Sequence, residues 1–138
     1  MATINMQTMR YINLLDKASN VKTKRCFVYN NIVFFAVPRE LVSRAIGPNA
    51  SNVKKIQDNL GRKVRIIVEP EGLKNLLRFV EDVVAPARFK SLEIIDENAV
   101  ITAGSNQNKA VLIGRNKRRL EELQAIINDI FAIDIKIL

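Results

Sequence analysis

The sequence predicts an α+β protein that consists of two similar units in tandem. Hydrophobic periodicity gives the order helix, strand, strand, helix, turn, helix and strand, and this order occurs twice along the 138 residues. In each half a glycine separates two amphipathic helices, Gly47 in the first and Gly114 in the second. Hydrophobic residues at 48% and charged residues at 26% are typical of a folded globular chain. We therefore expect two domains, residues 1–70 and residues 71–138.

The first half begins with a helix over residues 5–17, which is followed by two strands. The strands cover residues 22–29 and 32–37, where β-branched and aromatic side chains are frequent. Asn30 and Asn31 suit the tight turn between them, because asparagine tolerates a left-handed backbone. The pattern therefore predicts a helix followed by a β-hairpin.

Two helices and a strand complete the first half. Pro38 suits the first turn of a helix, and Gly47 separates that helix from the next one. Gly61 ends the second helix, as glycine commonly does. The apolar positions of the two helices are Leu41, Val42, Ala45, Val53, Ile56 and Leu60. Alternating apolar residues over 64–68 then predict a closing strand.

The second half repeats this order after a more regular first helix. Residues 72–84 place apolar side chains on one helical face, and a proline just beyond prevents continuation. This face consists of Leu73, Leu76, Leu77, Val80, Val83 and Val84. Strands over residues 88–95 and 99–103 follow, and a helix begins near Ser105 or Asn106, either of which can cap it.

The rest of the second half matches the first at an offset of 67 residues. The offset pairs Ile46, Gly47, Asn49 and Gln57 with Ile113, Gly114, Asn116 and Gln124. Apolar positions around Gly114 are Ala110, Val111, Ile113, Leu120, Leu123, Ile127 and Ile130. A further slip of two residues aligns the closing strands, so that Val64 corresponds to Ile133. Residues 69–72, which contain a proline and a glycine, form the predicted boundary between the units.

Positive charge is concentrated in the first half. The chain has 22 Lys and Arg residues and 14 Asp and Glu residues, which gives a net charge of +8. Residues 1–68 contain 12 basic and 3 acidic residues, whereas residues 69–138 contain 10 and 11, so the halves carry +9 and −1. Such a surface attracts polyanions and favours a nucleic-acid partner, although an anionic membrane or a purely solubilising role also fits.

The composition excludes several kinds of site. The chain has no histidine, and therefore no His-dependent triad or His-based metal site. Its single cysteine, Cys26, cannot form an intramolecular disulfide, and its apolar surroundings predict a buried, inert thiol. No P-loop spacing accompanies the glycine turns, and acidic residues are scattered, so we expect no enzyme, cofactor or metal site. The longest uncharged stretch, residues 26–38, is too short to span a membrane, so we expect a cytoplasmic protein.

Each glycine turn places the N-terminus of a helix beside a loop. The first backbone N–H groups of a helix have no partner within it, and the helix dipole adds partial positive charge, so this end attracts phosphates. Glycine also allows another chain to approach closely. The alternative is that Gly47 and Gly114 only supply the positive φ that a turn between helices requires.

The helix, Ile-Gly turn, helix and strand resemble the KH domain, in which a GxxG loop holds a sugar-phosphate chain beside an apolar groove for bases. The resemblance covers the whole chain, and the element order is similar to the type II arrangement and to the paired KH domains of the archaeal NusA-like family. It implies two α+β domains, each with helices on one face of a three-stranded mixed sheet. It also implies single-stranded RNA as a partner, RNA polymerase as a further partner, and a role in transcription elongation or termination.

Both loops depart from GxxG at the fourth position, which is alanine in one and lysine in the other. In the first half, the resemblance places RNA contacts on Gly47, Pro48, Asn49, Ala50, Lys54 and Lys55. In the second half, it places them on Gly114, Arg115, Asn116, Lys117 and Arg118. The second loop has the stronger charge, whereas the first lacks a basic middle residue.

A groove for bases is expected between the paired helices and the closing strand. The candidates in the first half are Ile46, Val53, Ile56 and Val64. Their counterparts are Ile113, Leu120, Leu123 and Ile133. For each of these side chains a plain core role is the alternative, so the expectation concerns the edge of the apolar layer.

Two functions remain open at the level of sequence. The first is a non-catalytic protein whose two KH units hold one single-stranded segment of a transcript. The second is a protein-interaction module that has lost RNA binding and docks on RNA polymerase or a ribosomal partner. The missing fourth glycines favour the second, and the basic cluster at residues 115–119 favours the first. A steep salt dependence of RNA binding would separate them.

Overall fold

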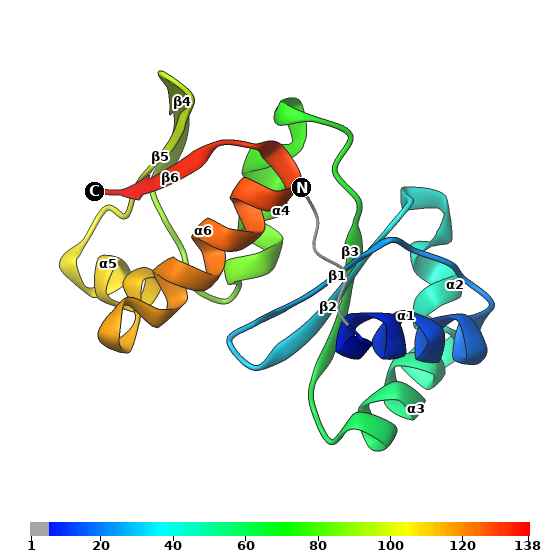
Figure 1. Ribbon diagram of the computed structural model, residues 1–138. Helices are drawn as coiled ribbons and strands as arrows, with labels where there is room; N and C mark the ends of the chain where they lie inside the picture. Colours follow the sequence, from blue (N-terminus) through cyan, green and yellow to red (C-terminus); the bar gives the residue numbers. More distant parts are fainter. Residues whose placement is uncertain (1–5) are drawn as a thin grey trace. The chain divides into compact units, whose positions relative to one another are not determined.

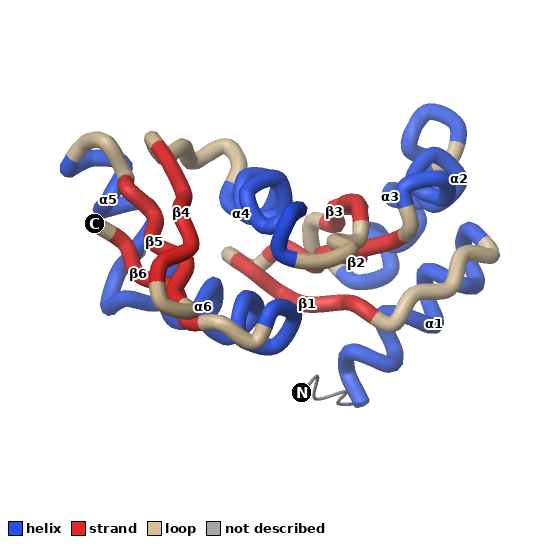
Figure 2. The backbone as a smooth tube through the Cα atoms, turned by 90° about the horizontal axis from the view of Figure 1, so that it is seen from above, coloured by secondary structure: helices blue, strands red, loops and turns tan. Residues whose placement is uncertain are grey.

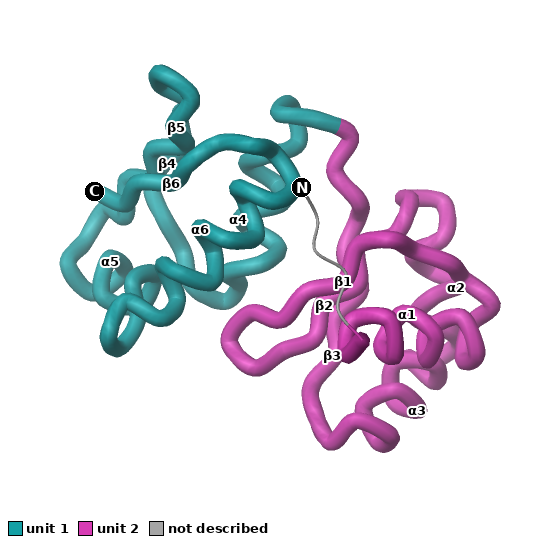
Figure 3. The backbone as a smooth tube through the Cα atoms, viewed as in Figure 1, with its two compact units in different colours: residues 1–2, 72–138 teal, residues 3–71 magenta. Residues whose placement is uncertain are grey.

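The computed structural model describes residues 6–138 and divides into two compact units (Figures 1 and 3). Of the described residues, 6–71 form the N-terminal unit and Gly72–Leu138 form the C-terminal unit. The division therefore falls within the segment 69–72. Each unit has its own sheet (Figure 2).

The N-terminal unit contains three helices longer than one turn and a three-stranded sheet. Its elements are α1 (Met6–Ser19), β1 (Arg25–Tyr29), β2 (Ile32–Val37), η1 (Arg39–Leu41), α2 (Val42–Ile46), η2 (Pro48–Ala50), α3 (Ser51–Leu60) and β3 (Val64–Val68). In the sheet β1 pairs with β2 in antiparallel orientation, and β2 pairs with β3 in parallel orientation. The start predicted for α1, residue 5, lies outside the described residues.

The C-terminal unit repeats this topology. Its elements are η3 (Leu73–Asn75), α4 (Leu76–Val84), β4 (Ser91–Ile95), β5 (Asn98–Thr102), α5 (Asn106–Ile113), η4 (Arg115–Lys117), α6 (Arg118–Phe131) and β6 (Asp134–Ile137). Strand β4 pairs antiparallel with β5, and β5 pairs parallel with β6. The predicted α+β units with three-stranded mixed sheets are thus confirmed.

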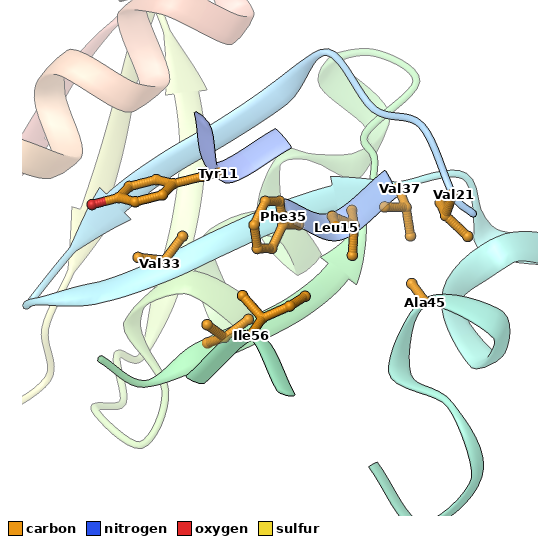
Figure 4. Packing of buried hydrophobic residues seen from close by; sticks show 9 residues of the cluster. Tyr11, Leu15, Val21, Val33, Phe35, Val37, Ala45 and Ile56 are labelled. Atoms are coloured by element: carbon orange, nitrogen blue, oxygen red, sulfur yellow. The ribbon is translucent and has the colours of Figure 1, made fainter. Parts of the chain in front are cut away.

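The core of the N-terminal unit lies between its sheet and its helices (Figure 4). Alternate residues of β2, including Val33 and Phe35, point to this side and pack with Leu15 of α1 and Ile56 of α3. Cys26 packs against the same cluster, and burial raises the pKa of its thiol to about 12. The thiol therefore stays protonated near neutral pH, which agrees with the predicted inert character, although Cys26 is half-buried instead of buried.

A row of side chains crosses the opposite face of the N-terminal sheet. Phe27 lies directly across from Phe34, and their rings stack at 5.1 Å between centroids. Arg65 is the partner of Phe34 on β3 and lies over its ring at 5.9 Å. The alternation of strand residues between two faces explains why this row is separate from the core cluster.

The core of the C-terminal unit is mainly aliphatic and includes an aromatic pair. Phe79 of α4 meets Phe131 of α6 edge-on, at 5.5 Å between ring centroids. The largest fully buried side chains of this unit are Leu76, Phe79, Ile101, Leu112, Leu123 and Ile127. Ser105 caps α5, since its side-chain oxygen accepts a hydrogen bond from the N–H of Asn108.

Two predicted helix faces need correction. On the helix predicted at residues 72–84, Leu73 and Leu77 are 47% exposed, whereas Phe79 is buried. Leu73 belongs to the short turn η3, which precedes α4 and does not continue its helical phase. On α5 the predicted Val111 is exposed and Leu112 is buried. Residues 110–113 are all apolar, so periodicity could not identify the inward side.

The alignment of the closing strands also needs correction. Val64 pairs with Val33, and the residue in the corresponding place of the second sheet is Ile135, which pairs with Ala99. Val64 therefore corresponds to Ile135 and not to Ile133. The slip is four residues instead of two, because α6 has 14 residues and α3 has 10, which is one additional helical turn.

Two of the predicted strands, at residues 22–29 and 88–95, were too long at their starts. Strand β1 begins at Arg25, because the hydroxyl of Thr23 accepts a hydrogen bond from the Arg25 N–H and donates one to the carbonyl of Ala36. Strand β4 begins at Ser91. The chain leaves α4 through a turn in which the N–H of Ala87 donates to the carbonyl of Val84.

Candidate nucleic-acid interface

The two glycine loops have the same backbone conformation. In the first loop Gly47 has φ 81° and ψ 165°, and Asn49 and Ala50 both have left-handed angles, φ 55° and 60°. In the second loop Gly114 has φ 74° and ψ 172°, and it too is followed by two left-handed residues, with φ 56° and 60°. The fourth position of each loop is therefore left-handed, where glycine would be the unstrained residue.

Backbone hydrogen bonds close each loop in the same way. The N–H of Ala50 donates to the carbonyl of Gly47 at 3.1 Å, and the N–H of Lys117 donates to the carbonyl of Gly114 at 3.2 Å. A helix begins directly after each loop, α3 at Ser51 and α6 at Arg118. The N–H groups of Ser51 and Arg118 also donate within these turns, to the carbonyls of Pro48 and Arg115, so the attraction for an anion comes chiefly from the helix dipole.

Space as well as backbone angle disfavours a side chain at both glycines. A Cβ on Gly47 would lie 2.8 Å from the side-chain atoms Nδ2 of Asn52 and Oγ of Ser51. A Cβ on Gly114 would lie 2.6 Å from Cγ of Arg119 and 3.0 Å from its backbone nitrogen. The second loop is therefore less tolerant of a side chain at its glycine, because a backbone atom cannot move aside as the end of a side chain can.

The residue five positions after each glycine supports the loop, and sequence reasoning missed this role. Asn52 donates from Nδ2 to the carbonyl of Arg44 at 3.0 Å, which connects α3 to the last turn of α2. Arg119 lies against Gly114 and pairs with Glu122 at 3.1 Å, with only 17% of its side chain exposed. Asn52 and Arg119 are equivalent at the offset of 67 residues, and this equivalence could have indicated their shared role.

The loops differ in charge. Arg115, Lys117 and Arg118 are exposed around the second loop, whereas Arg119 is half-buried and ion-paired. Around the first loop the exposed residues are Pro48 and Asn49, which carry no charge. Its cations lie on the flanking helices, namely Arg44, Lys54 and Lys55, all of them exposed. Proline also has no N–H group, so Arg115 offers a backbone donor that Pro48 lacks.

The candidate base-contact residues fall into two groups. Ile46, Val53, Ile113 and Leu120 flank the loops and are half-buried, so part of each side chain reaches the surface. Ile56, Val64, Leu123 and Ile133 are at most 7% exposed and belong to the cores. Ile56 is therefore a core residue in this structure, and only the first group forms an accessible apolar edge.

The repeated glutamines have a structural role. The side-chain oxygen of Gln57 accepts a hydrogen bond from the N–H of Val64 at 3.0 Å. That of Gln124 accepts one from the N–H of Ile135 at 2.9 Å. Each glutamine thus attaches the helix after the loop to the closing strand, which holds the helix N-terminus in a defined place.

Other kinds of site have no support in the described part of the chain. Among residues 6–138, no group of three or more His, Cys, Asp or Glu side chains could hold a metal ion. Within the same residues, no helix combines the length and the apolar character needed to cross a membrane.

Comparisons with known proteins agree with this geometry. The family model described as the KH domain matches residues 32–81, which include the first glycine loop. A "Probable transcription termination protein NusA" from Halococcus morrhuae is 30% identical over 137 residues, covering 93% of this chain and 96% of that protein. A solved structure described as "Crystal structure of APE1850" has a TM-score of 0.66 at 22% identity, covering 98% of this chain and 100% of that one. At this identity the last comparison supports the fold alone.

Proposed function

Because this chain belongs to the archaeal NusA-like family of KH-domain proteins, we propose that it binds single-stranded RNA and acts in transcription elongation and termination. In this proposal its units are two type II KH domains that hold one segment of a transcript, and RNA polymerase is a further partner. The same role would cover antitermination, depending on the RNA sequence held. The protein acts by binding, without catalysis, in the cytoplasm.

The observation that carries this proposal is the repeated loop. Two segments of different sequence, 47–50 and 114–117, have the same backbone angles and the same closing hydrogen bond. Each leads into a helix whose dipole places partial positive charge beside the loop. Exposed cations accompany both loops, on the loop itself in the C-terminal unit and on the adjacent helices in the N-terminal unit.

Single-stranded RNA fits this site better than duplex RNA. The accessible apolar edge beside each loop consists of single aliphatic side chains, Ile46 and Val53 in one unit and Ile113 and Leu120 in the other. Such an edge can receive an unstacked base, whereas the bases of an A-form helix are stacked and paired. Phosphates at the loop and bases at the edge together define a short single-stranded site.

Two such sites on one chain increase the affinity for a longer strand. A single small module binds weakly, but a second contact on the same chain is intramolecular. It can raise the overall affinity by roughly 10² to 10⁴ when the RNA is long enough to reach both. RNA length is therefore a variable that any binding measurement must include.

Electrophoretic shifts with single-stranded and duplex RNA, each at low and moderate salt, test the RNA-binding proposal. We expect tighter binding of single strands, with an affinity that falls as salt rises. Equal or tighter binding of duplex RNA at moderate salt would indicate nonspecific charge and would overturn a KH-type mechanism.

The transcription role needs a separate measurement. Stalled and terminating complexes of the cognate RNA polymerase should show altered pausing or release when the protein is added. The Gly47→Asp variant, folded but impaired in the loop, should lose this effect. An effect that persists in a variant unable to bind RNA would contradict the proposed link between RNA binding and transcription.

A further inference from the structure

The C-terminal sheet has an exposed edge at β4. Its strand order is β4-β5-β6, so among residues 6–138 β4 has a paired neighbour on one side only. Ile94 and Ile95, at the end of this strand, are 44% and 48% exposed. Strand β1 has the same place in the other sheet, yet all five of its residues are half-buried or buried. An edge with unpaired backbone groups and exposed apolar side chains is a template for pairing with another strand.

The charge of this hairpin disfavours RNA as the occupant. Residues 91–102 contain Glu93, Asp96 and Glu97 and no lysine or arginine. All three acidic residues are exposed. A polyanion would be repelled, whereas a cationic partner would be attracted.

We infer that β4 is a docking edge for a basic, extended segment of a partner protein, which adds to the sheet as a further strand. Backbone hydrogen bonds would supply affinity, and alternate side chains would supply specificity. This surface is separate from the glycine loops in sequence, and the inference does not depend on RNA binding.

The faces of the strand define the sequence of the segment. Leu92 and Ile94 pair across from Ile101 and Ala99, which are buried on the side of the helices, so these residues share one apolar face. Glu93 lies on the other face. A matching strand would therefore alternate apolar residues, placed beside Ile94, with lysine or arginine, placed beside Glu93.

A capped heptapeptide of alternating Lys and Val is a suitable probe for the full-length protein. Amide chemical shifts should change mainly over β4 and the adjoining turn on titration, with intermolecular contacts to the β4 backbone. A peptide of equal charge with proline in place of its central valine cannot complete the ladder and should bind about tenfold or more weakly.

Protein variants test separately the contribution of the acidic residues and that of the exposed apolar residues of β4. The triple change Glu93→Gln, Asp96→Asn, Glu97→Gln should weaken peptide binding by about tenfold or more and leave single-stranded RNA binding undiminished. The matched control is Glu40→Gln, Asp58→Asn, Glu81→Gln, which removes three exposed acidic charges elsewhere and should retain the peptide. Ile94→Ser with Ile95→Ser, in a variant that circular dichroism shows to be folded, should also lose the peptide.

The inference is overturned if the peptide binds at a different surface, if the proline peptide binds equally well, or if both triple variants behave alike. Loss of RNA binding by the loop variants with retention of the peptide would leave this inference standing. Retention of RNA binding with no peptide binding would reject it and leave the proposed function intact.

Discussion

The two glycine loops share a backbone but differ in what supports them and in what charge they present. In the first loop Asn52 provides support through a neutral hydrogen bond to α2. In the second loop Arg119 provides it by packing on Gly114 and pairing with Glu122. Exposed cations lie on the second loop itself, but only on the helices beside the first.

This difference shows that loop shape and loop charge are separate properties in this fold. The shape follows from a glycine with positive φ, two left-handed residues and the helix that begins after them. The charge comes from side chains that the shape does not require. Variants can therefore change one property at a time.

The largest effect is expected from Gly47→Asp and Gly114→Asp. A side chain in these backbone conformations costs about 1–3 kcal/mol of stability, and the carboxylate repels a phosphate at the loop. We expect RNA affinity to fall about tenfold or more for both, since each adds a negative charge at a phosphate contact. Urea unfolding should show the greater loss for Gly114→Asp, because backbone as well as side-chain atoms of Arg119 lie in the way.

The control for these variants is Gly61→Asp. Gly61 is also left-handed, but apart from its chain neighbours no heavy atom of the described residues lies within 4 Å of an added Cβ, and it stands at the far end of α3 from the loop. Its RNA affinity should stay close to that of the parent. If folded Gly47→Asp and Gly114→Asp proteins also bind RNA as tightly as the parent, the loops are not the phosphate clamp.

The second prediction concerns the charge of the second loop. The change Arg115→Glu with Lys117→Glu should lower RNA affinity for all sequences alike, because phosphate contacts position the strand without specifying its bases. If each cation meets one phosphate, the slope of log affinity against log salt should fall by about 1.4 for the pair. Fluorescence anisotropy across a salt series measures this slope.

Exposed cations of the same unit provide the matched control. Lys90→Glu with Lys136→Glu changes the net charge equally but lies away from the loop in sequence. An equal change of slope in both double variants would mean that overall charge, and not the loop, attracts the RNA.

The order of the elements and the place of the loops could be predicted because they depend on local signals. Glycine, proline and asparagine mark the turns, and apolar spacing marks the elements between them. The closing strand of the second unit was misaligned because periodicity does not show where a helix ends when no glycine stops it. The left-handed residue that follows α6 is Ala132, whereas the one that follows α3 is Gly61.

Contacts within the candidate site were less predictable. The basic cluster at residues 115–119 looks uniform in the sequence, yet Arg119 is engaged with Glu122 while its neighbours are exposed. The inward direction of Ile56 also depends on tertiary packing against α1 and the sheet. Charge and hydrophobicity identify the region, and only the packing decides which side chain is available.

The third prediction separates Arg118 from Arg119. Arg118→Gln should lower the salt slope by about 0.7 if it meets a phosphate, and stability should change by less than about 0.5 kcal/mol. Arg119→Gln should leave the slope unchanged and cost about 1 kcal/mol, because it removes packing on Gly114 together with a partly buried ion pair. If the salt slope falls for Arg119→Gln and not for Arg118→Gln, Arg119 leaves Glu122 to bind RNA.

The smallest effects are expected from restoring glycine at the fourth position of each loop. Ala50 and Lys117 are both left-handed, a conformation that costs a residue with a side chain about 1–2 kcal/mol. Glycine removes this cost but loses about 0.5–1 kcal/mol through its greater freedom in the unfolded chain. Ala50→Gly and Lys117→Gly should therefore each stabilise the protein by about 0.5–1 kcal/mol.

The two glycine variants should differ in their effect on RNA. Ala50→Gly removes no charge, so the salt slope should stay the same, and affinity should hold or rise as the loop admits a phosphate more closely. Lys117→Gly removes a cation, so the slope should fall by about 0.7 even though the protein becomes more stable.

Asn49→Gly is the control for strain, since asparagine already tolerates this conformation and little stability should be gained. A loss of stability in Ala50→Gly would mean that packing of the Ala50 methyl group stabilises the protein by more than its left-handed backbone destabilises it. An unchanged slope in Lys117→Gly would place the phosphate of the second loop on Arg115 and Arg118 alone.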